Sequence, residues 1–262
     1  MKSLISVIIP VYQAEKFIEE AVKSCAFFDE VGEVLLIEDG STDGSLNECQ
    51  RIVQYIEKVK LFCHKDNENR GPSASRNLGI EKAEFPFIAF LDADDYFLPN
   101  RFESFKLFLD SVDFDGIYQP VQYFNGSSKI YGIRKEIPPR KLFYYLIRGT
   151  YGHFHTNGLI VKRDLLVKAG LFNETLKLHQ DSELWLKLAF YGRLVSGNIS
   201  LPVSMVRVHE GNRIWKGTSN SSRLNQWKVT WRWAWNKPVG FVNKLLILRK
   251  LFKYKKSSLK ER

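Results

Sequence analysis

Cysteine is scarce in this chain of 262 residues, and long apolar runs are absent. The three cysteines, Cys25, Cys49 and Cys63, are odd in number, widely spaced and set among apolar residues. They predict reduced core thiols in a reducing compartment and argue against a disulfide framework or a cysteine metal cluster. No segment reaches the roughly 18 apolar residues of a membrane-spanning helix. The apolar start LISVIIPVY reaches Pro10 without a small-residue cleavage site, so we expect a core strand there and not a signal peptide.

Acidic residues are nearly missing from the last part of the chain. Residues 223–262 carry 12 Lys or Arg and one acid, Glu261, for a net charge of +11. Residues 1–222 carry 27 basic and 28 acidic residues, a net charge of −1. The tail therefore carries the whole positive surplus.

The same tail is rich in aromatic and apolar side chains that share a rough helical face in its second part. These are Trp227, Trp231, Trp233 and Trp235, then Phe241, Leu245, Leu248 and Phe252. Tryptophans beside a polybasic helix are typical of proteins that lie on an anionic membrane surface. We expect a cytoplasmic protein, peripheral on the inner face of the membrane. The alternatives are a helix packed on the domain, a solvated tail, and nucleic-acid binding through interleaved basic and aromatic residues.

Apolar segments alternate with helical patterns in the first 95 residues. Strands are expected at 4–10, 33–38, 60–63 and 86–91, with helices between them. Pro72 suits the first turn of the helix before the fourth strand. This alternation predicts an α/β fold with a parallel, doubly wound sheet.

The second half is less regular, and no internal repeat is visible. Strands at 114–124 and 129–133 are expected to form a hairpin around Asn125-Gly126, a strong turn signal. Further helices are expected at 140–148 and 182–191. Further strands are expected at 156–161 and, as one or two pieces, within 194–208.

The segment FIAFLDADD, residues 87–95, joins an apolar strand to three carboxylates, Asp92, Asp94 and Asp95. Carboxylates this close repel one another unless a cation or strong donors hold them together. Polar clusters also follow the preceding strands, at 39–43 and 71–77, and parallel topology brings strand ends to one sheet edge. A divalent metal site at this edge is the favoured interpretation; a solvated acidic turn is the alternative.

Six segments in order resemble a family 2 inverting glycosyltransferase of the GT-A fold, bacterial cell-surface polysaccharide type. They are SVIIPVYQAEKFI, LIEDGSTDGS, GPSASRNLGI, FIAFLDADDYFLP, VKAGLFNETLKLHQDSELWLKLAFYG and VRVHEGN, covering about residues 4–213. The resemblance implies a Rossmann-like α/β/α sandwich with a mostly parallel central sheet, followed by a basic helical tail. It divides the chain into a glycosyltransferase domain, 1–222, and the tail, 223–262. Within the domain, the nucleotide-sugar half is about 1–98 and the acceptor half about 99–222.

The resemblance also implies which residues bind the nucleotide. Base and ribose would be held by Pro10, Val11, Tyr12, Glu15 and Asp39. A carboxylate such as Asp39 can accept a hydrogen bond from a base N–H or a ribose hydroxyl; the alternative is a turn or cap residue. Glu38 stands where the family usually has Asp.

The central acidic segment corresponds to the family's DxD motif. By resemblance, Asp94 binds Mn²⁺ or Mg²⁺, and Asp92 contacts ribose or metal-bound water. The metal would neutralise the departing diphosphate, since no P-loop is present to do so. Arg76 would bind the diphosphate, or pair structurally with Asp92 or Asp94. His209 would complete the metal shell or bind a phosphate; a structural histidine is the alternative, and Ile214 replaces a Ser often found after it.

Asp181 falls where the family places its general base, which takes the proton of the acceptor hydroxyl as its oxygen attacks the anomeric carbon. Gln180 replaces the Glu that usually precedes this residue. An N-cap role is the alternative for Asp181. His153, His155, Thr156 and Asn157 are expected near the acceptor.

The implied function is metal-dependent transfer of a sugar from a nucleoside diphosphate, UDP by default, to a saccharide or lipid-linked hydroxyl. One alternative is a haloacid-dehalogenase-like phosphatase, for which Tyr96 is the wrong residue and the acidic motif lies too far along the chain. The other is a non-catalytic nucleotide- or nucleic-acid-binding protein with the tail as its working part.

Overall fold

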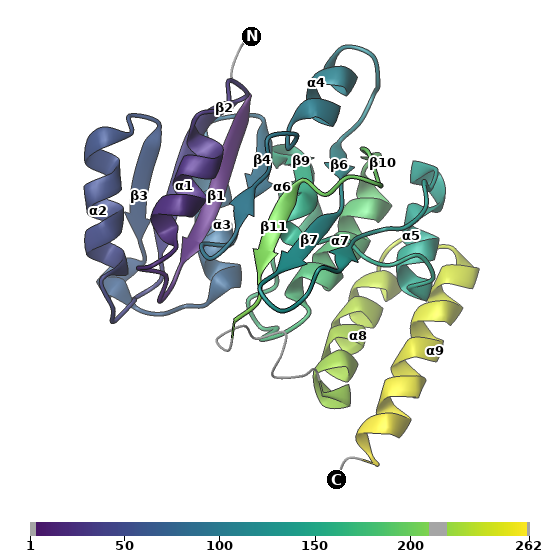
Figure 1. Ribbon diagram of the computed structural model, residues 1–262. Helices are drawn as coiled ribbons and strands as arrows, with labels where there is room; N and C mark the ends of the chain where they lie inside the picture. The colour runs from purple at the N-terminus through teal and green to yellow at the C-terminus, as the bar shows by residue number, and fades with distance from the viewer. Residues whose placement is uncertain (1–3, 210–218, 261–262) are drawn as a thin grey trace.

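The computed structural model describes residues 4–209 and 219–260, and a seven-stranded sheet forms its centre (Figure 1). The strand order is β10-β6-β9-β4-β1-β2-β3. Its strands are β1 (Ile5–Val11), β2 (Val31–Glu38), β3 (Val59–Cys63), β4 (Phe87–Phe90), β6 (Gly116–Tyr118), β9 (Leu159–Lys162) and β10 (Leu194–Ser196). β1 to β4 are mutually parallel, as are β6 and β10, whereas β9 runs antiparallel to both its neighbours. The expected mostly parallel sheet is confirmed.

Helices cover both faces of this sheet, because alternate residues of each strand point to opposite sides. Ile5, Val7 and Ile9 of β1 belong to one core cluster, and Ile8 belongs to the other. The first cluster includes α1 (Ile18–Ala26), α2 (Ser45–Tyr55) and α4 (Glu103–Leu109). The second includes α3 (Pro72–Lys82), α5 (Pro139–Arg148), α6 (Arg163–Ala169) and α7 (Gln180–Tyr191). The expected α/β/α sandwich is therefore confirmed.

A smaller sheet of four strands lies beside the central one, in the order β5-β11-β7-β8. Its strands are β5 (Tyr96–Phe97), β7 (Val121–Phe124), β8 (Ile130–Tyr131) and β11 (Ser204–Arg207). The predicted hairpin is β7–β8, and both Asn125 and Gly126 adopt positive φ, as a tight turn requires. The prediction of one strand over 114–124 is wrong: the chain leaves the central sheet after β6 and enters the small sheet at β7. Pro120 lies at this break, where its missing N–H cannot continue a ladder.

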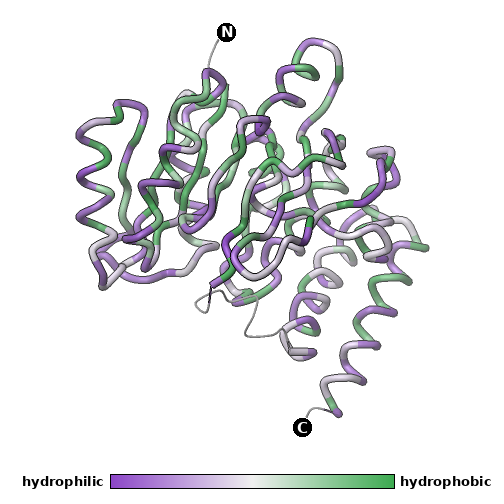
Figure 2. The backbone as a smooth tube through the Cα atoms, viewed as in Figure 1, coloured by the Kyte–Doolittle hydropathy of each residue, from purple (hydrophilic) through white to green (hydrophobic). Residues whose placement is uncertain are grey.

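The tail forms two helices, α8 (Asn220–Trp235) and α9 (Phe241–Ser258), which lie side by side on the domain (Figure 1). Trp227 of α8 and Ile247 of α9 are buried in the same cluster as α5 and α7. Residue 222 falls inside α8, so the proposed domain limit lies within a helix. Figure 2 shows hydrophobic and hydrophilic segments along α9. None of the helices described is both long and apolar enough to cross a bilayer.

The cysteines agree only partly with the expectation of core thiols. Cys25 and Cys49 are free and buried, and burial raises the pKa of the Cys49 thiol to about 12. Cys63 is also free but exposed at the end of β3, because the chain leaves the sheet there. The apolar residues around it in the sequence belong to an edge strand.

Candidate active site

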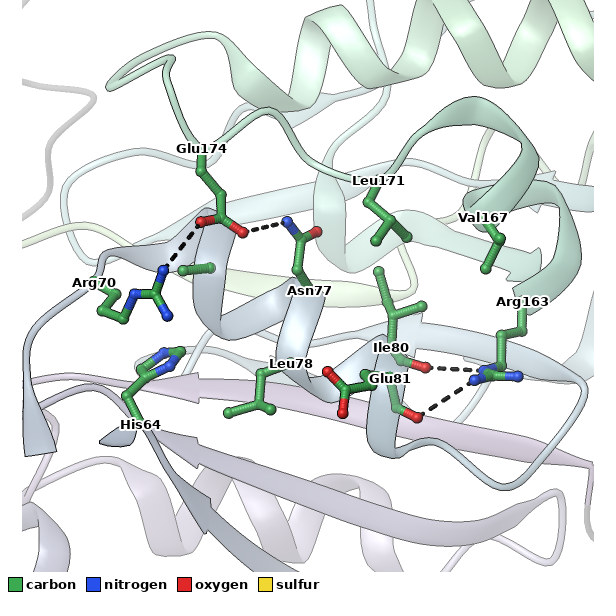
Figure 3. A pocket seen from close by; sticks show the side chains of 11 residues that line it. His64, Arg70, Asn77, Leu78, Ile80, Glu81, Arg163, Val167, Leu171 and Glu174 are labelled. Carbon is green, nitrogen blue, oxygen red and sulfur yellow. Dashed lines mark hydrogen bonds and ion pairs between the residues drawn. The ribbon is translucent and has the colours of Figure 1, made fainter. Parts of the chain in front are cut away.

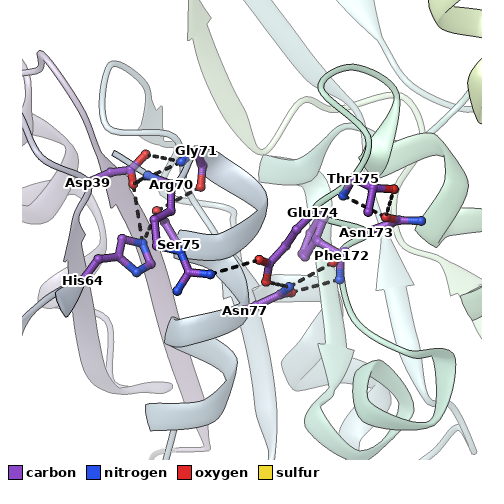
Figure 4. Close-up of polar contacts among 10 residues, drawn as sticks. All are labelled: Asp39, His64, Arg70, Gly71, Ser75, Asn77, Phe172, Asn173, Glu174 and Thr175. Carbon is purple, nitrogen blue, oxygen red and sulfur yellow. Dashed lines mark hydrogen bonds and ion pairs between the residues drawn. The ribbon is translucent and has the colours of Figure 1, made fainter. Parts of the chain in front are cut away.

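The carboxyl ends of β1, β2 and β4 bring the acidic residues of the nucleotide half to one sheet edge. Asp39, directly after β2, is 3% exposed, and its backbone N donates to Val11 O at 2.9 Å. Its carboxylate accepts from the backbone N of Arg70 (2.7 Å) and Gly71 (2.9 Å) (Figure 4). Asp39 thus holds the loop before α3 and does not cap its own turn. These bonds orient a carboxylate at the position expected to read the nucleotide.

His64 supports the same carboxylate from β3. Its Nε2 lies 3.5 Å from Asp39 Oδ1 and is hydrogen-bonded to Ser75 Oγ at 3.0 Å. Glu38 accepts from the backbone N of Gly40 and Ser41. The Glu38 side chain therefore hydrogen-bonds the loop that follows it. This is a structural role for the residue that replaces the family's usual Asp. His64 was missed because one histidine after a strand carries no signal of its partners.

The other residues expected at the nucleotide lie around Asp39. Val11 is buried, Pro10 is half-buried, and Tyr12 is 45% exposed. Glu15 is exposed and accepts from Gly44 N, where α2 begins. Tyr12 and Glu15 thus form an accessible rim beside a rigid, buried carboxylate.

The three carboxylates of the acidic segment 92–95 differ in burial: Asp92 and Asp94 are half-buried, and Asp95 is buried. Arg76 and Asp92 form an ion pair of 2.6 Å, and Arg76 also lies over the Phe172 ring. Asp94 and His209 Nε2 lie 2.7 Å apart. Burial, then the neighbouring Asp92 charge, raises the pKa of Asp94. Arg76 therefore forms the structural ion pair with Asp92 that was one of its two expected roles.

Asp95 points inward and is 2% exposed. Its carboxylate accepts from Asn157 Nδ2 at 2.6 Å and from Arg207 N at 2.7 Å. Burial, followed by repulsion from Asp94 and Asp92, raises its pKa well above the usual value. Asn157 also accepts from Asp92 N, and Arg207 Nε donates to Asp94 O. Asn157 and Arg207 therefore hold the acidic loop, which is defined as residues 92–95. Their sequence context did not reveal this role.

A divalent cation would find a partial site here. Asp94 and His209 offer the oxygen and nitrogen donors that Mn²⁺ accepts, and Mg²⁺ commonly takes few protein ligands and completes its shell with phosphate and water. Residues 4–209 and 219–260 contain no group of three or more His, Cys, Asp or Glu side chains placed to bind a metal. Asp94 and His209 would therefore suit a metal whose remaining ligands come from a bound diphosphate. Residues 210–218, including Ile214, lie outside the described residues.

Asp181 lies in the first turn of α7, whose N-cap is His179 in the left-handed region. The alternative N-cap role for Asp181 is therefore not what the structure shows. Its Oδ1 accepts from Ser182 N, and the side chain is half-buried. The Asp181 charge favours a higher pKa at two tyrosines and three histidines, with burial as the larger influence on each; they are Tyr123, Tyr131, His153, His155 and His179. None of the aromatic partners was expected except His153 and His155.

His155 lies beside Asn157, which holds the acidic segment 92–95. Its buried ring experiences the charges of Asp92, Asp94 and Asp181, although burial dominates and lowers its pKa. The ring also accepts from Asn157 N through Nδ1 at 3.2 Å. Asn157 in turn binds Asp95 and the backbone N of Asp92, so His155 supports the acidic segment 92–95 through Asn157.

A separate pocket of about 420 Å³ lies between α3 and the α6 region (Figure 3). Glu174 closes one end, where it accepts from Asn77 Nδ2 at 2.9 Å and lies 3.7 Å from Arg70. At the other end Arg163 donates to the Ile80 and Glu81 carbonyls. The pocket lacks the carboxylates of residues 92–95 and Asp181, and it adjoins the candidate active site through His64 and Arg70, which contact Asp39.

This arrangement agrees with comparisons to known proteins. Residues 6–169 match the model of the family described as glycosyl transferase family 2, and the chain belongs to that family.

Among its relatives, an uncharacterised glycosyltransferase of Rickettsia conorii is 32% identical over 209 residues, 79% of this chain and 33% of its own length. The minor teichoic acid biosynthesis protein GgaA of Bacillus subtilis is 30% identical over 207 residues, 74% and 46% of the two chains. The chain thus spans less than half the length of these curated relatives.

Among solved structures, S. aureus TarS 1–349 in complex with UDP-GlcNAc has a TM-score of 0.78 at 22% identity, over 97% of this chain and 72% of that one. A mannosyltransferase of Pyrobaculum calidifontis with GDP-Man and Mn²⁺ has a TM-score of 0.64 at 18% identity, over 96% and 70%. These likenesses show a shared fold.

Proposed function

We propose that the chain is a metal-dependent inverting glycosyltransferase. It would move a sugar from a nucleoside diphosphate, UDP by default, to a hydroxyl of a saccharide or lipid-linked acceptor in cell-surface polysaccharide synthesis. The observation that carries this proposal is the pairing of Asp94 with His209 and of Asp92 with Arg76 directly after β4, in a chain that belongs to glycosyl transferase family 2. Family membership and the relative named for teichoic acid biosynthesis support it. The alternative phosphatase has no support in this family.

Each carboxylate has one task in the proposed reaction. Asp39 accepts a hydrogen bond from the nucleotide, and Arg76 and Asp92 face the diphosphate side. Asp94 and His209 would hold Mn²⁺ or Mg²⁺, and a metal bound there would supply positive charge against the leaving diphosphate. Asp181 takes the proton of the acceptor hydroxyl through Oδ2, because Oδ1 is engaged by Ser182 N. The acceptor oxygen bonds to the anomeric carbon as the opposite bond to phosphate breaks, so the configuration inverts.

A thermal-shift screen of UDP, GDP and dTDP with and without Mn²⁺ tests the donor side. One nucleotide should raise the melting temperature, and Mn²⁺ should enlarge the rise, since ligands that bind the folded state stabilise it. Asp94→Ala should lose the Mn²⁺-dependent part, whereas Asp113→Ala, at an 84% exposed side chain, should retain it. Failure of all three nucleotides, together with salt-sensitive nucleic-acid binding, would favour the non-catalytic binding alternative.

We also propose that α9 rests on the inner face of an anionic membrane. Phe241, Leu245 and Phe252 are 75%, 48% and 58% exposed, and their spacing puts them on one face, opposite buried Ile247. Removal of residues 223–262 would be a poor test, because it would also remove buried core residues. Instead, the double variant Phe241→Ser, Phe252→Ser should bind anionic vesicles more weakly than the parent chain while melting at the same temperature. Equal vesicle binding would reject the proposal.

A further inference from the structure

Hydrogen bonds join α7 to α8 near Asp181, and α9 to α5. His179, at the start of α7, has Nε2 3.2 Å from Ser222 Oγ of α8. Lys250 of α9 donates through Nζ to Arg148 O, at the end of α5, at 3.1 Å. A Cβ added to Gly149 would lie 3.3 Å from His153 Nε2. The tail is thus joined to the segments that surround the candidate base.

Positive charge gathers at this junction. The basic cluster is defined as Arg148, Arg223, Arg249, Lys250 and Lys253. Lys250 is half-buried, and burial followed by the charges of the other four lowers its pKa. Within 4–209 and 219–260, the ion pairs include none from Arg148, Arg249, Lys250 or Lys253. Like charges held together in this way raise the energy of the folded chain, and an anionic ligand would lower it.

Helix capping does not account for the cluster. Lys244, also on α9, donates to Trp235 O at the end of α8 and lies 5.8 Å from the Trp235 ring. Lys250 does the same at α5 and lies 5.9 Å from the Trp227 ring. Capping therefore explains Lys250 but not the further cations Arg223 and Lys253, which both lie over the Tyr254 ring, at 6.0 and 5.6 Å.

The basic cluster lies close to the start of α7, because Arg223 follows Ser222, whose Oγ lies 3.2 Å from Nε2 of His179, two residues before Asp181. His153 experiences the charges of Asp181, Lys250 and Arg223 together, and Tyr131 experiences those of Asp181 and Arg223. The Tyr131 ring lies 6.1 Å from His155. Aromatic rings beside polar groups are a common lining for small-molecule sites. An acceptor whose hydroxyl reaches Asp181 would therefore pass beside the cluster.

We propose that Arg223, Lys250 and Arg148 bind an anionic group of the acceptor, a phosphate or carboxylate, while a sugar hydroxyl of the same molecule faces Asp181. This inference depends on the proposed function, because it takes Asp181 as the base. Guanidinium groups suit planar or tetrahedral oxyanions through paired N–H donors, and an ammonium adds a point charge. The cluster would select charged acceptors over neutral ones.

Binding of glucose 1-phosphate, compared with neutral methyl glucoside, tests the proposal on the full chain with UDP and Mn²⁺ present in excess to fill the donor site. Arg223→Gln and Lys250→Gln should each weaken glucose 1-phosphate binding about tenfold, the size of one charge-assisted hydrogen bond. Lys250→Arg should retain most of the affinity. Lys244→Gln, the matched cap variant, should bind like the parent, and methyl glucoside should not distinguish the variants.

Equal glucose 1-phosphate binding in all variants, no binding by the parent, or an equal loss in Lys244→Gln would overturn the proposal. A second arm uses phosphatidylglycerol vesicles without sugar, which Arg223→Gln and Lys250→Gln should bind like the parent. If they lose vesicle binding and keep glucose 1-phosphate binding, the cluster serves lipid headgroups and the proposal is wrong. The nucleotide shift is measured on the same samples, so failure of the donor site is seen separately from failure of the cluster.

Discussion

Asp39 and Asp181, the two key carboxylates of the proposed site, are held in different ways. Asp39 is fixed by backbone N–H groups of a neighbouring strand–helix connection, at Arg70 and Gly71. Asp181 follows a left-handed residue, His179, whose ring contacts Ser222 of the tail. The first arrangement arises from consecutive βα units, whereas the second requires segments distant in sequence to be docked. Donor binding should therefore tolerate changes in the tail better than transfer does.

The largest expected effect separates the two halves by function. Asp181→Asn should lower the transfer rate by about 10²–10⁴-fold, the usual contribution of a general base, while nucleotide affinity stays within about twofold. Asp94→Ala should instead weaken nucleotide binding in the presence of Mn²⁺. Steady-state transfer kinetics and nucleotide titration on both variants measure the contrast. Full transfer activity in Asp181→Asn would refute the assignment of the base.

The next effect distinguishes the two faces of the tail. Trp227→Ala should destabilise the chain by about 3–5 kcal/mol, because the side chain is 6% exposed and belongs to the core under α5 and α7. Phe252→Ser, at a 58% exposed position, should change the free energy of unfolding by about 0.5 kcal/mol or less. Denaturant unfolding measures both. Similar losses in the two variants would mean that α9 does not dock as described.

A smaller effect concerns the bridge between the halves. Asn77 of α3 accepts from Phe172 N and donates to Phe172 O, each at 2.9 Å, and also donates to Glu174 (Figure 4). Asn77→Ala should cost about 1–3 kcal/mol, because backbone groups lose their partners. The exposed Asn69→Ala serves as the control in thermal unfolding. No difference between them would show that the bridge is dispensable.

The smallest effect is a pH dependence centred on His155. Burial lowers its pKa below the ordinary 6.5, so the folded state holds the ring neutral and binds fewer protons than the unfolded state. Its contribution to stability is present above pH 6.5 and is lost as the pH falls through the lowered pKa. Protonation would also remove the Nδ1 acceptor for Asn157 N. His155→Gln should show a shallower loss of melting temperature on acidification, with His153 and His179 supplying the remainder. An identical slope would contradict this role.

The regular elements could be predicted because their signals are local. Apolar runs marked β1, β2 and β4, and Asn125-Gly126 marked the hairpin. The strand predicted over 114–124 failed because its composition is continuous while Pro120 and the pairing partners change. Periodicity reports which residues are apolar, but it cannot report which sheet they join.

Site residues that directly follow a strand could be predicted from the sequence. Site residues that reach the strand ends from distant parts of the chain could not. The DxD segment and Asp39 could be placed at one edge from topology alone. Asn157 and Arg207, which hold Asp95 inward, could not, because their bonds connect residues far apart in the chain. Neither side chain has a local pattern that distinguishes it from a surface polar residue.

By itself, the sequence determined the α/β class, the strand-end carboxylates and the family, because these depend on local pattern and on the order of motifs. Only the tertiary structure decided that Asp95 is buried while Asp94 meets His209, and that the basic tail docks against the domain. Those outcomes depend on which distant groups satisfy a buried charge or cover an apolar face. That choice is made when the chain packs.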